Sequence, residues 1–248
     1  MNSKIESLSL DSLIPFENHP YKVIDNEEMA ALVESIKLSG IMVPLAVRTL
    51  DEEGKYKIIS GHRRLYAARQ AGLETVPALI YALERDSAAI ALVDSNLHRE
   101  NILPSEKAFA YKLKAEALMH RGQRTDLSSV QLAPKLATEI VAEADNTSKD
   151  TVKRYIRLTH LVLELLELVD DKRIAFTPAV ELSYLTEQEQ YTLLDAIESE
   201  DCTPSLSQAQ RMKKLSQESR LTGGYLRNHE RREAQPAREN QAVSRACA

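Results

Sequence analysis

The chain has 248 residues, with 32 Lys and Arg against 37 Asp and Glu, and a formal net charge of −5. Its 43% apolar and 28% charged residues are typical of a folded globular protein with one large domain or two small ones. The negative charge argues against a protein that coats nucleic acid along its whole surface, but it allows binding through a local basic patch.

The sequence also predicts the compartment. No apolar run approaches the roughly 18 residues that a membrane span requires, and the first residues lack the basic and apolar regions of a signal peptide. The two cysteines, Cys202 and Cys247, have no partner at metal-ligand spacing. We therefore expect a reduced, cytoplasmic protein with no membrane partner.

The first hundred residues alternate between strand-like and helical patterns, which predicts a compact α/β unit. Asn26 is a typical N-cap and Gly40 a typical helix end, and the polar turn 51–54 between two apolar runs indicates a hairpin. In chain order we expect a strand over 9–14, a helix over 27–39, a hairpin of 45–48 with 56–59, a helix over 63–71, a strand over 76–80 and a helix capped by Asp86.

The most informative motif follows the second strand of that hairpin. There Gly61, His62, Arg63 and Arg64 lead from a short β-prone run into a helix. This order directs backbone N–H groups, the positive end of a helix and two guanidinium groups at one place, which is the arrangement of a phosphate site. A solvated surface turn has the same sequence pattern, and the motif alone leaves both interpretations open.

After Pro104 the pattern is almost wholly helical, and we expect helices near 105–121, 136–144, 148–160, 161–169, 178–185, 187–197 and 205–221. From residue 223 onward the sequence is polar and rich in Arg and Glu, which predicts a disordered tail.

Two of these helices form a candidate helix–turn–helix. The second of them carries four basic residues and one acid between Ser148 and Arg157, and Val152 lies on its predicted apolar side. A recognition helix in a major groove requires this combination of an apolar inner face and a cationic outer face. We expect the outer face to carry Ser148, Lys149, Thr151, Lys153, Arg154 and Arg157. Ser148, Lys149 and Lys153 could reach base edges. Arg154 and Arg157 are better placed to contact phosphates. A solvated basic helix is the alternative interpretation.

A third segment joins the two parts of the chain. Asn96 and Arg99 are one helical turn apart and together could meet an anion or a hydrated metal ion. The alternative is a well-capped helix boundary in which Arg99 pairs with Glu100 on the surface. The six histidines show no metal-ligand spacing, and no Ser/His/Asp arrangement is identifiable.

Taken together, these features resemble the ParB family of partition proteins over about residues 8–200. The resemblance rests on three ordered boxes, at 13–20 with 34–48, at 61–73 and at 96–108, together with 151–158 and Pro178-Ala179 in the DNA-binding part. It implies an α+β protein: a ParB-like N-terminal nucleotide-binding domain at 1–104, a helical helix–turn–helix domain at 105–200, and a C-terminal helix and tail at 201–248.

The resemblance also implies a function. In such proteins CTP with Mg²⁺ closes two N-terminal domains into a clamp around DNA. Carried over to this chain, the triphosphate would be held by Gly61, His62, Arg63 and Arg64, the metal by Asn96, and the nucleotide by Arg99. The expected partners are double-stranded DNA, a second copy in a homodimer and a ParA-type ATPase, with the protein associated with the nucleoid.

The chain departs from the family pattern at three places. His62 stands where the family usually has Glu, Ser95 stands where it has an acid, and His19-Pro20-Tyr21 replaces Gln-Pro-Arg. The loss of the acid at Ser95 weakens the case for hydrolysis, so at most a weak CTPase is expected. The departures favour a plasmid or mobile-element variant. The alternatives are a helix–turn–helix regulator with a vestigial nucleotide site, or a nuclease or kinase on the same N-terminal fold.

Overall fold

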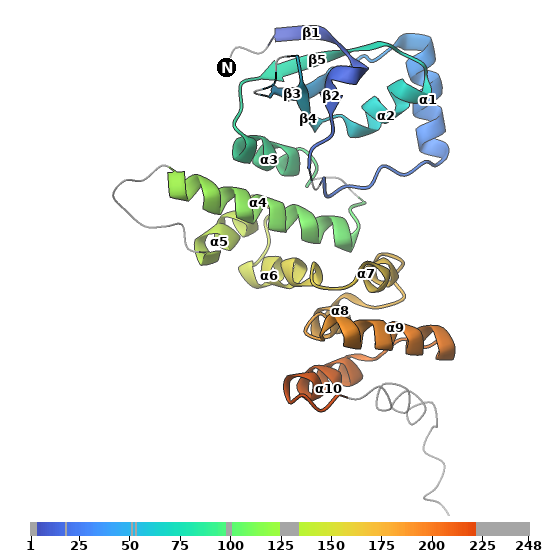
Figure 1. Ribbon diagram of the computed structural model, residues 1–248, viewed down its shortest axis with the longest axis vertical. Coiled ribbons are helices and arrows are strands. Elements are labelled where there is room, and N and C mark those ends of the chain that lie inside the picture. The colour runs from blue at the N-terminus through green and yellow to red at the C-terminus, as the bar shows by residue number, and fades with distance from the viewer. Residues whose placement is uncertain are drawn as a thin grey trace, which may run out of the picture. The chain divides into compact units, whose positions relative to one another are not determined.

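A computed structural model describes residues 4–17, 19–50, 52, 54–97, 101–124 and 134–221 (Figure 1). These residues fall into two compact units. The first comprises the chain up to Ile102 together with Glu106–Lys153, and the second comprises Leu103–Ser105 together with the chain from Arg154 onward. The predicted domain limits at 104 and 200 stay predictions.

The α+β class is confirmed, because one mixed sheet precedes a long series of helices (Figure 1). The strands are β1 Lys4–Ser9, β2 Leu13–Ile14, β3 Leu45–Thr49, β4 Tyr56–Ser60 and β5 Thr75–Tyr81. The helices of the first part are α1 Glu27–Ser39, α2 His62–Gln70 and α3 Arg85–Asp94. Those that follow are α4 Pro104–Arg124, α5 Pro134–Ala144, α6 Lys149–Leu158, α7 Leu163–Asp170, α8 Phe176–Leu182, α9 Glu187–Glu200 and α10 Leu206–Gln217.

The sheet has the order β1-β5-β3-β4-β2. Strands β3 and β4 pair antiparallel, which confirms the predicted hairpin, and β3 also pairs with β5 in parallel. The strand predicted over 9–14 is wrong as a single element. A 3-10 turn at Leu10–Ser12 interrupts it, because the Ser9 side chain accepts a hydrogen bond from Asp11 N (3.3 Å) and turns the chain from β1 into β2.

The core of the first unit lies between the sheet and α2. Leu45, Val47 and Ile58 are fully buried and contact Leu65 and Ala68 of α2. Helix α1 packs against α2. Its start is fixed as predicted, because Asn26 Oδ1 accepts a hydrogen bond from Met29 N at 3.0 Å. It ends at Gly40, whose φ is 67°.

Buried leucines and the buried amide of Gln190 help to hold the second unit together. Gln190 is 2% exposed, yet its side chain donates to the carbonyls of His160 (3.0 Å) and Leu185 (3.1 Å) and accepts from Val162 N (2.8 Å). These bonds fix the turn between α6 and α7 against the start of α9. Capping boxes at Thr186 and Ser205 set the starts of α9 and α10. Among the described residues no helix is both long and apolar enough to cross a bilayer.

The two isoleucines Ile58 and Ile5 test where the first core lies. Ile58 is fully buried in β4, whereas Ile5 in the edge strand β1 is 61% exposed. Because Ile58→Ala leaves a cavity, we expect it to lower the free energy of unfolding by about 2–5 kcal/mol. Ile5→Ala should change it by less than about 0.5 kcal/mol. Urea denaturation of both variants measures the difference, and equal losses would contradict this assignment of the core.

Candidate functional site

A pocket of about 70 Å³ lies where β4 ends and α2 begins. It is lined by His19, Tyr21, Lys22, Val23, Ser60, Gly61, His62, Arg63, Arg64 and Asn96. The structure therefore brings together five of the six residues predicted to bind the nucleotide and metal. Arg99 lies outside the described residues. The sequence motifs assigned no binding role to Val23 or Ser60, which also line the pocket.

Gly61 makes the turn between β4 and α2 possible. Its φ is 110°, in the left-handed region that L side chains rarely adopt. A Cβ there would lie 2.9 Å from Leu45 Cγ and 3.2 Å from Arg64 Nη2. Helix α2 begins without a side-chain cap, so the positive end of its dipole faces the pocket.

The two arginines are held differently. The Arg63 guanidinium lies 3.2 Å from the exposed carboxylate of Glu28. An exposed ion pair of this kind contributes little free energy, so a phosphate can readily replace Glu28. Arg64 instead donates to the backbone carbonyls of Val43 and Pro44, the latter at 2.7 Å. Arg64 therefore lines the pocket while it also holds the segment that leads into β3.

Two of the departures from the family pattern meet in this pocket. The rings of His19 and His62 stack with their centroids 3.6 Å apart and their planes 39° apart. His19 Nδ1 donates to Tyr21 O at 2.8 Å, and His62 Nε2 accepts from Phe16 N at 3.4 Å. These bonds orient both rings. Residues from two boxes of the sequence, more than 40 positions apart, thus form one wall.

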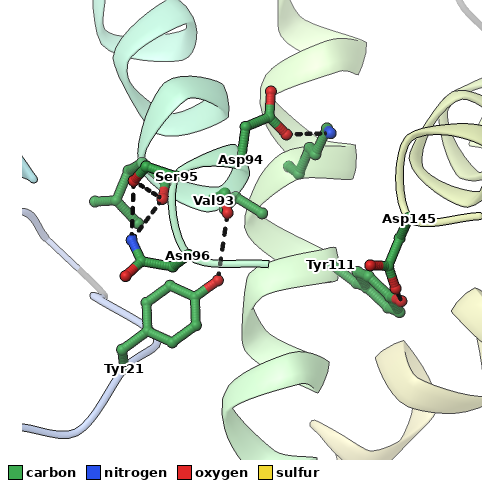
Figure 2. A network of polar contacts seen from close by, with 9 residues as sticks. Tyr21, Val93, Asp94, Ser95, Asn96, Tyr111 and Asp145 are labelled. Atoms are coloured by element: carbon green, nitrogen blue, oxygen red, sulfur yellow. Dashed lines mark hydrogen bonds and ion pairs between the residues drawn. The ribbon is translucent and has the colours of Figure 1, made fainter. Parts of the chain in front are cut away.

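Asn96 also lines the pocket, and Figure 2 shows its side chain beside Ser95 and Tyr21. It is 5% exposed, and its Nδ2 donates to Leu92 O at 2.8 Å and to Ser95 Oγ at 3.0 Å. Because a carbonyl oxygen only accepts, this bond to Leu92 fixes the amide so that Oδ1 points away from both partners. The Tyr21 hydroxyl lies beside it and donates to Val93 O at 3.5 Å.

The donors of the pocket suit an anion. They are cationic side chains, imidazoles and a helix N-terminus, with Asn96 Oδ1 as a neutral oxygen that a cation could use. Of the residues that the structure describes, no three His, Cys, Asp or Glu side chains are close enough to hold a metal ion. Mg²⁺ commonly binds through phosphate oxygens with one or two protein ligands, which fits this donor set.

Helix α6 carries the second group of predicted residues. Val152 and Leu158 are fully buried, whereas Ser148, Lys149 and Lys153 are exposed. Ser148 Oγ accepts from Thr151 N at 3.1 Å and so fixes the start of the helix. The predicted amphipathic character of this helix, with Val152 on its inner face, is confirmed.

The two arginines of α6 contact side chains of the following helices. Arg154 donates to Thr177 Oγ1 at 2.9 Å, and its guanidinium lies 4.9 Å from the Phe176 ring centroid. Arg157 donates to Ser183 Oγ (3.1 Å) and Ser183 O (2.6 Å) and lies over the Tyr184 ring. Both arginines are partly buried. The sequence placed them on the open side of the helix and did not indicate these contacts.

Comparison with known proteins agrees with this architecture. Residues 1–97 match the model of the ParB N-terminal domain. A nucleoid occlusion protein of Listeria innocua is 31% identical over 197 residues, which is 79% of this chain and 63% of the relative. A probable chromosome-partitioning protein ParB of Vibrio cholerae is 31% identical over 201 residues, 81% of this chain and 62% of the relative.

Among solved structures, a pNOB8-like ParB-N domain is similar with a TM-score of 0.51 and 17% identity, over 94% of this chain and 96% of that chain. This similarity concerns the fold alone. The match to the family model identifies residues 1–97 as a ParB N-terminal domain. The chain spans less than two thirds of the length of the curated relatives named above.

Glycine substitutions test the geometry of the pocket. Gly61→Ala forces an alanine into a left-handed backbone conformation and places its Cβ too close to Leu45. We therefore expect the free energy of unfolding to fall by about 2 kcal/mol or more. Gly72 at the other end of α2 has a φ of 76° but no atom within 4 Å of a built Cβ, so Gly72→Ala costs about 1–2 kcal/mol from conformation alone. Urea denaturation compares the two variants, and a Gly61→Ala protein no less stable than Gly72→Ala would contradict the close approach.

Proposed function

We propose that this chain is a DNA-binding protein of the partition and nucleoid-occlusion type, with a nucleotide-gated N-terminal domain. One observation supports the proposal: a pocket lined by cationic donors and an amphipathic, cationic helix occur together in a chain whose residues 1–97 match the ParB N-terminal domain. We also propose, from the departures at His19, Tyr21 and His62, that it serves a plasmid or another mobile element.

The DNA interface would be the outer face of α6. Ser148, Lys149, Thr151 and Lys153 lie at the start of the helix, where side chains reach base edges in the major groove. Arg154 and Arg157 would contact phosphates with the N–H groups that they do not use on Thr177 and Ser183. The acidic stretch 181–201, with seven acids and no Lys or Arg, would then face away from the DNA.

The pocket would hold the triphosphate of CTP. Arg63, Arg64 and the N-terminus of α2 at Gly61 would supply the positive charge, and Arg64 also fixes the shape of the pocket through its bond to Pro44 O. His62, whose Nε2 accepts from Phe16 N, would supply a neutral N–H donor at Nδ1. Asn96 Oδ1 would be the protein ligand of Mg²⁺, which offsets phosphate charge when bound. Arg99 completes the predicted set. The absence of an acid at position 95 removes a group that could orient a water molecule, so hydrolysis would be slow at most.

In the proposed cycle CTP closes the N-terminal domains of two copies around DNA, which requires a homodimer. A ParA-type ATPase would act as a further partner. These assignments follow from the family and would place the protein in the cytoplasm on the nucleoid.

The first prediction of this model concerns nucleotide binding. Arg63→Ala removes one charge-assisted contact to the triphosphate, so CTP affinity should fall about tenfold or more while binding to a short duplex survives. Calorimetry with CTP, ATP, GTP and UTP in the presence of Mg²⁺ measures the affinity and the selectivity. Arg69→Ala, on an exposed position of the same helix, is the control and should behave as the parent chain does. Failure of the parent chain to bind any nucleotide would favour the alternative of a nucleotide-independent regulator.

The second prediction concerns DNA. Arg154→Ala should weaken binding to every duplex and reduce the slope of log K against log salt by about 0.9, because one phosphate contact is lost. Thr177→Val removes the partner of Arg154 without removing its charge, so it should keep the salt slope. If Thr177→Val reproduces the loss, or if Arg154→Ala affects one sequence only, Arg154 does not act as a phosphate contact.

A further inference from the structure

A cationic cluster on the sheet of the first unit is separate from the residues that line the pocket. Arg48 of β3 and Lys57 of β4 are directly opposite each other in the antiparallel pair. Because strand side chains alternate between faces, both project from the face opposite Val47 and Ile58. Two like charges in this position destabilise a sheet unless an anion lies between them.

One carboxylate supplies part of that charge. Glu17, two positions before the lining residue His19, accepts a hydrogen bond from Lys57 Nζ at 2.7 Å. The same carboxylate lies 3.6 Å from the guanidinium of Arg85 at the start of α3. Lys57 is only 8% exposed, whereas the Glu17 side chain is 61% exposed. Lys57 and Arg85 thus contact one anion that can leave to solvent, and Arg48 lies opposite Lys57.

Arg48 is not satisfied by this arrangement. Its Nε atom is buried and has no hydrogen-bond partner among the described residues. A buried donor without a partner is costly, so a ligand that accepts from it gains free energy. The hydrogen bond from Lys57, with the charges of Lys57, Arg85 and Arg48, holds the pKa of the Glu17 carboxyl below its usual range. This shift has the direction expected for an excess of positive charge.

We propose that Arg48, Lys57 and Arg85 form a second anion site, which takes a phosphate group and in which Glu17 is the resident competitor. A phosphate dianion matches three cations better than one carboxylate does, and its oxygens can accept from a guanidinium and an ammonium together. Phosphate binding displaces Glu17 into solvent, where its exposed carboxylate is readily hydrated. The site does not depend on the proposed nucleotide function.

The experiment is a titration of the full chain with inorganic phosphate at constant ionic strength, followed by ¹H–¹⁵N NMR. Signals of residues 48, 57 and 85–87 report this site, and signals of residues 61–64 report the pocket. Glu17→Gln removes the competing charge, so phosphate should bind roughly fivefold more tightly at the first group of signals. Arg48→Gln removes a cationic donor, so binding there should weaken about tenfold or more.

Matched controls separate the site from general charge effects. Glu34→Gln and Arg69→Gln change the same charges at exposed positions of α1 and α2 and should leave the affinity at residues 48, 57 and 85–87 unchanged. If Arg48→Gln does not fold, the increase in phosphate affinity expected for Glu17→Gln still tests the second anion site. No saturable shift at these residues, or an affinity that Glu17→Gln leaves unchanged, would overturn the proposal.

Discussion

The junction between β4 and α2 is the constraint on which the first unit depends. Gly61 adopts a conformation closed to other residues, and the fully buried Leu45 occupies the space that a side chain would need. Arg64 then reaches back to the carbonyls of Val43 and Pro44, directly before Leu45. The pocket and the hydrophobic core therefore share one set of contacts. The close contact of Gly61 with Leu45, which packs the core, also sets the direction in which the N-terminus of α2 points.

Part of the pocket lining is a segment without helix or strand, which includes His19 to Val23, and hydrogen bonds and ion pairs hold it in place. Phe16 N donates to His62, Tyr21 donates to Val93, and Lys22 N donates to Glu106 Oε1 at 2.7 Å. Glu17 adds the ion pairs with Lys57 and Arg85. Each contact joins residues far apart in the chain, so this part of the lining forms only once the sheet, α3 and the start of α4 are folded. A ligand that alters one of these bonds would change the shape of the pocket.

Helix α6 combines two roles in adjacent residues. Its apolar side is buried at Val152 and Leu158, while Lys149 and Lys153 remain exposed. Arg154 and Arg157 are partly buried, and they use some of their N–H donors on Thr177 and Ser183. A guanidinium has five N–H donors, so structural contacts and a phosphate contact are compatible in one side chain. The fold itself therefore fixes the surroundings of these arginines.

Local signals in the sequence determined the elements and the motif. Asn26 and Gly40 bound α1 as predicted, and the polar residues between two apolar runs predicted the hairpin of β3 with β4. Gly61-His62-Arg63-Arg64 predicted the start of α2, while its alternative interpretations as an anion site or a solvated turn stayed open. These features are readable because they depend on residues within one helical turn or one hairpin. The 3-10 interruption at Leu10–Ser12 escaped prediction, since an apolar run of that length does not distinguish one strand from two.

Only the tertiary structure decided which distant residues meet. The stacking of His19 on His62, the Arg48–Lys57 pair beside Glu17, and the contacts of Arg157 with Ser183 join positions separated by between 9 and 43 residues. No periodicity encodes such pairs, because they depend on strand register and on how α3 and α8 pack. The sequence by itself thus determined the kind of chemistry this protein offers, and the fold decided which charges and rings share each site.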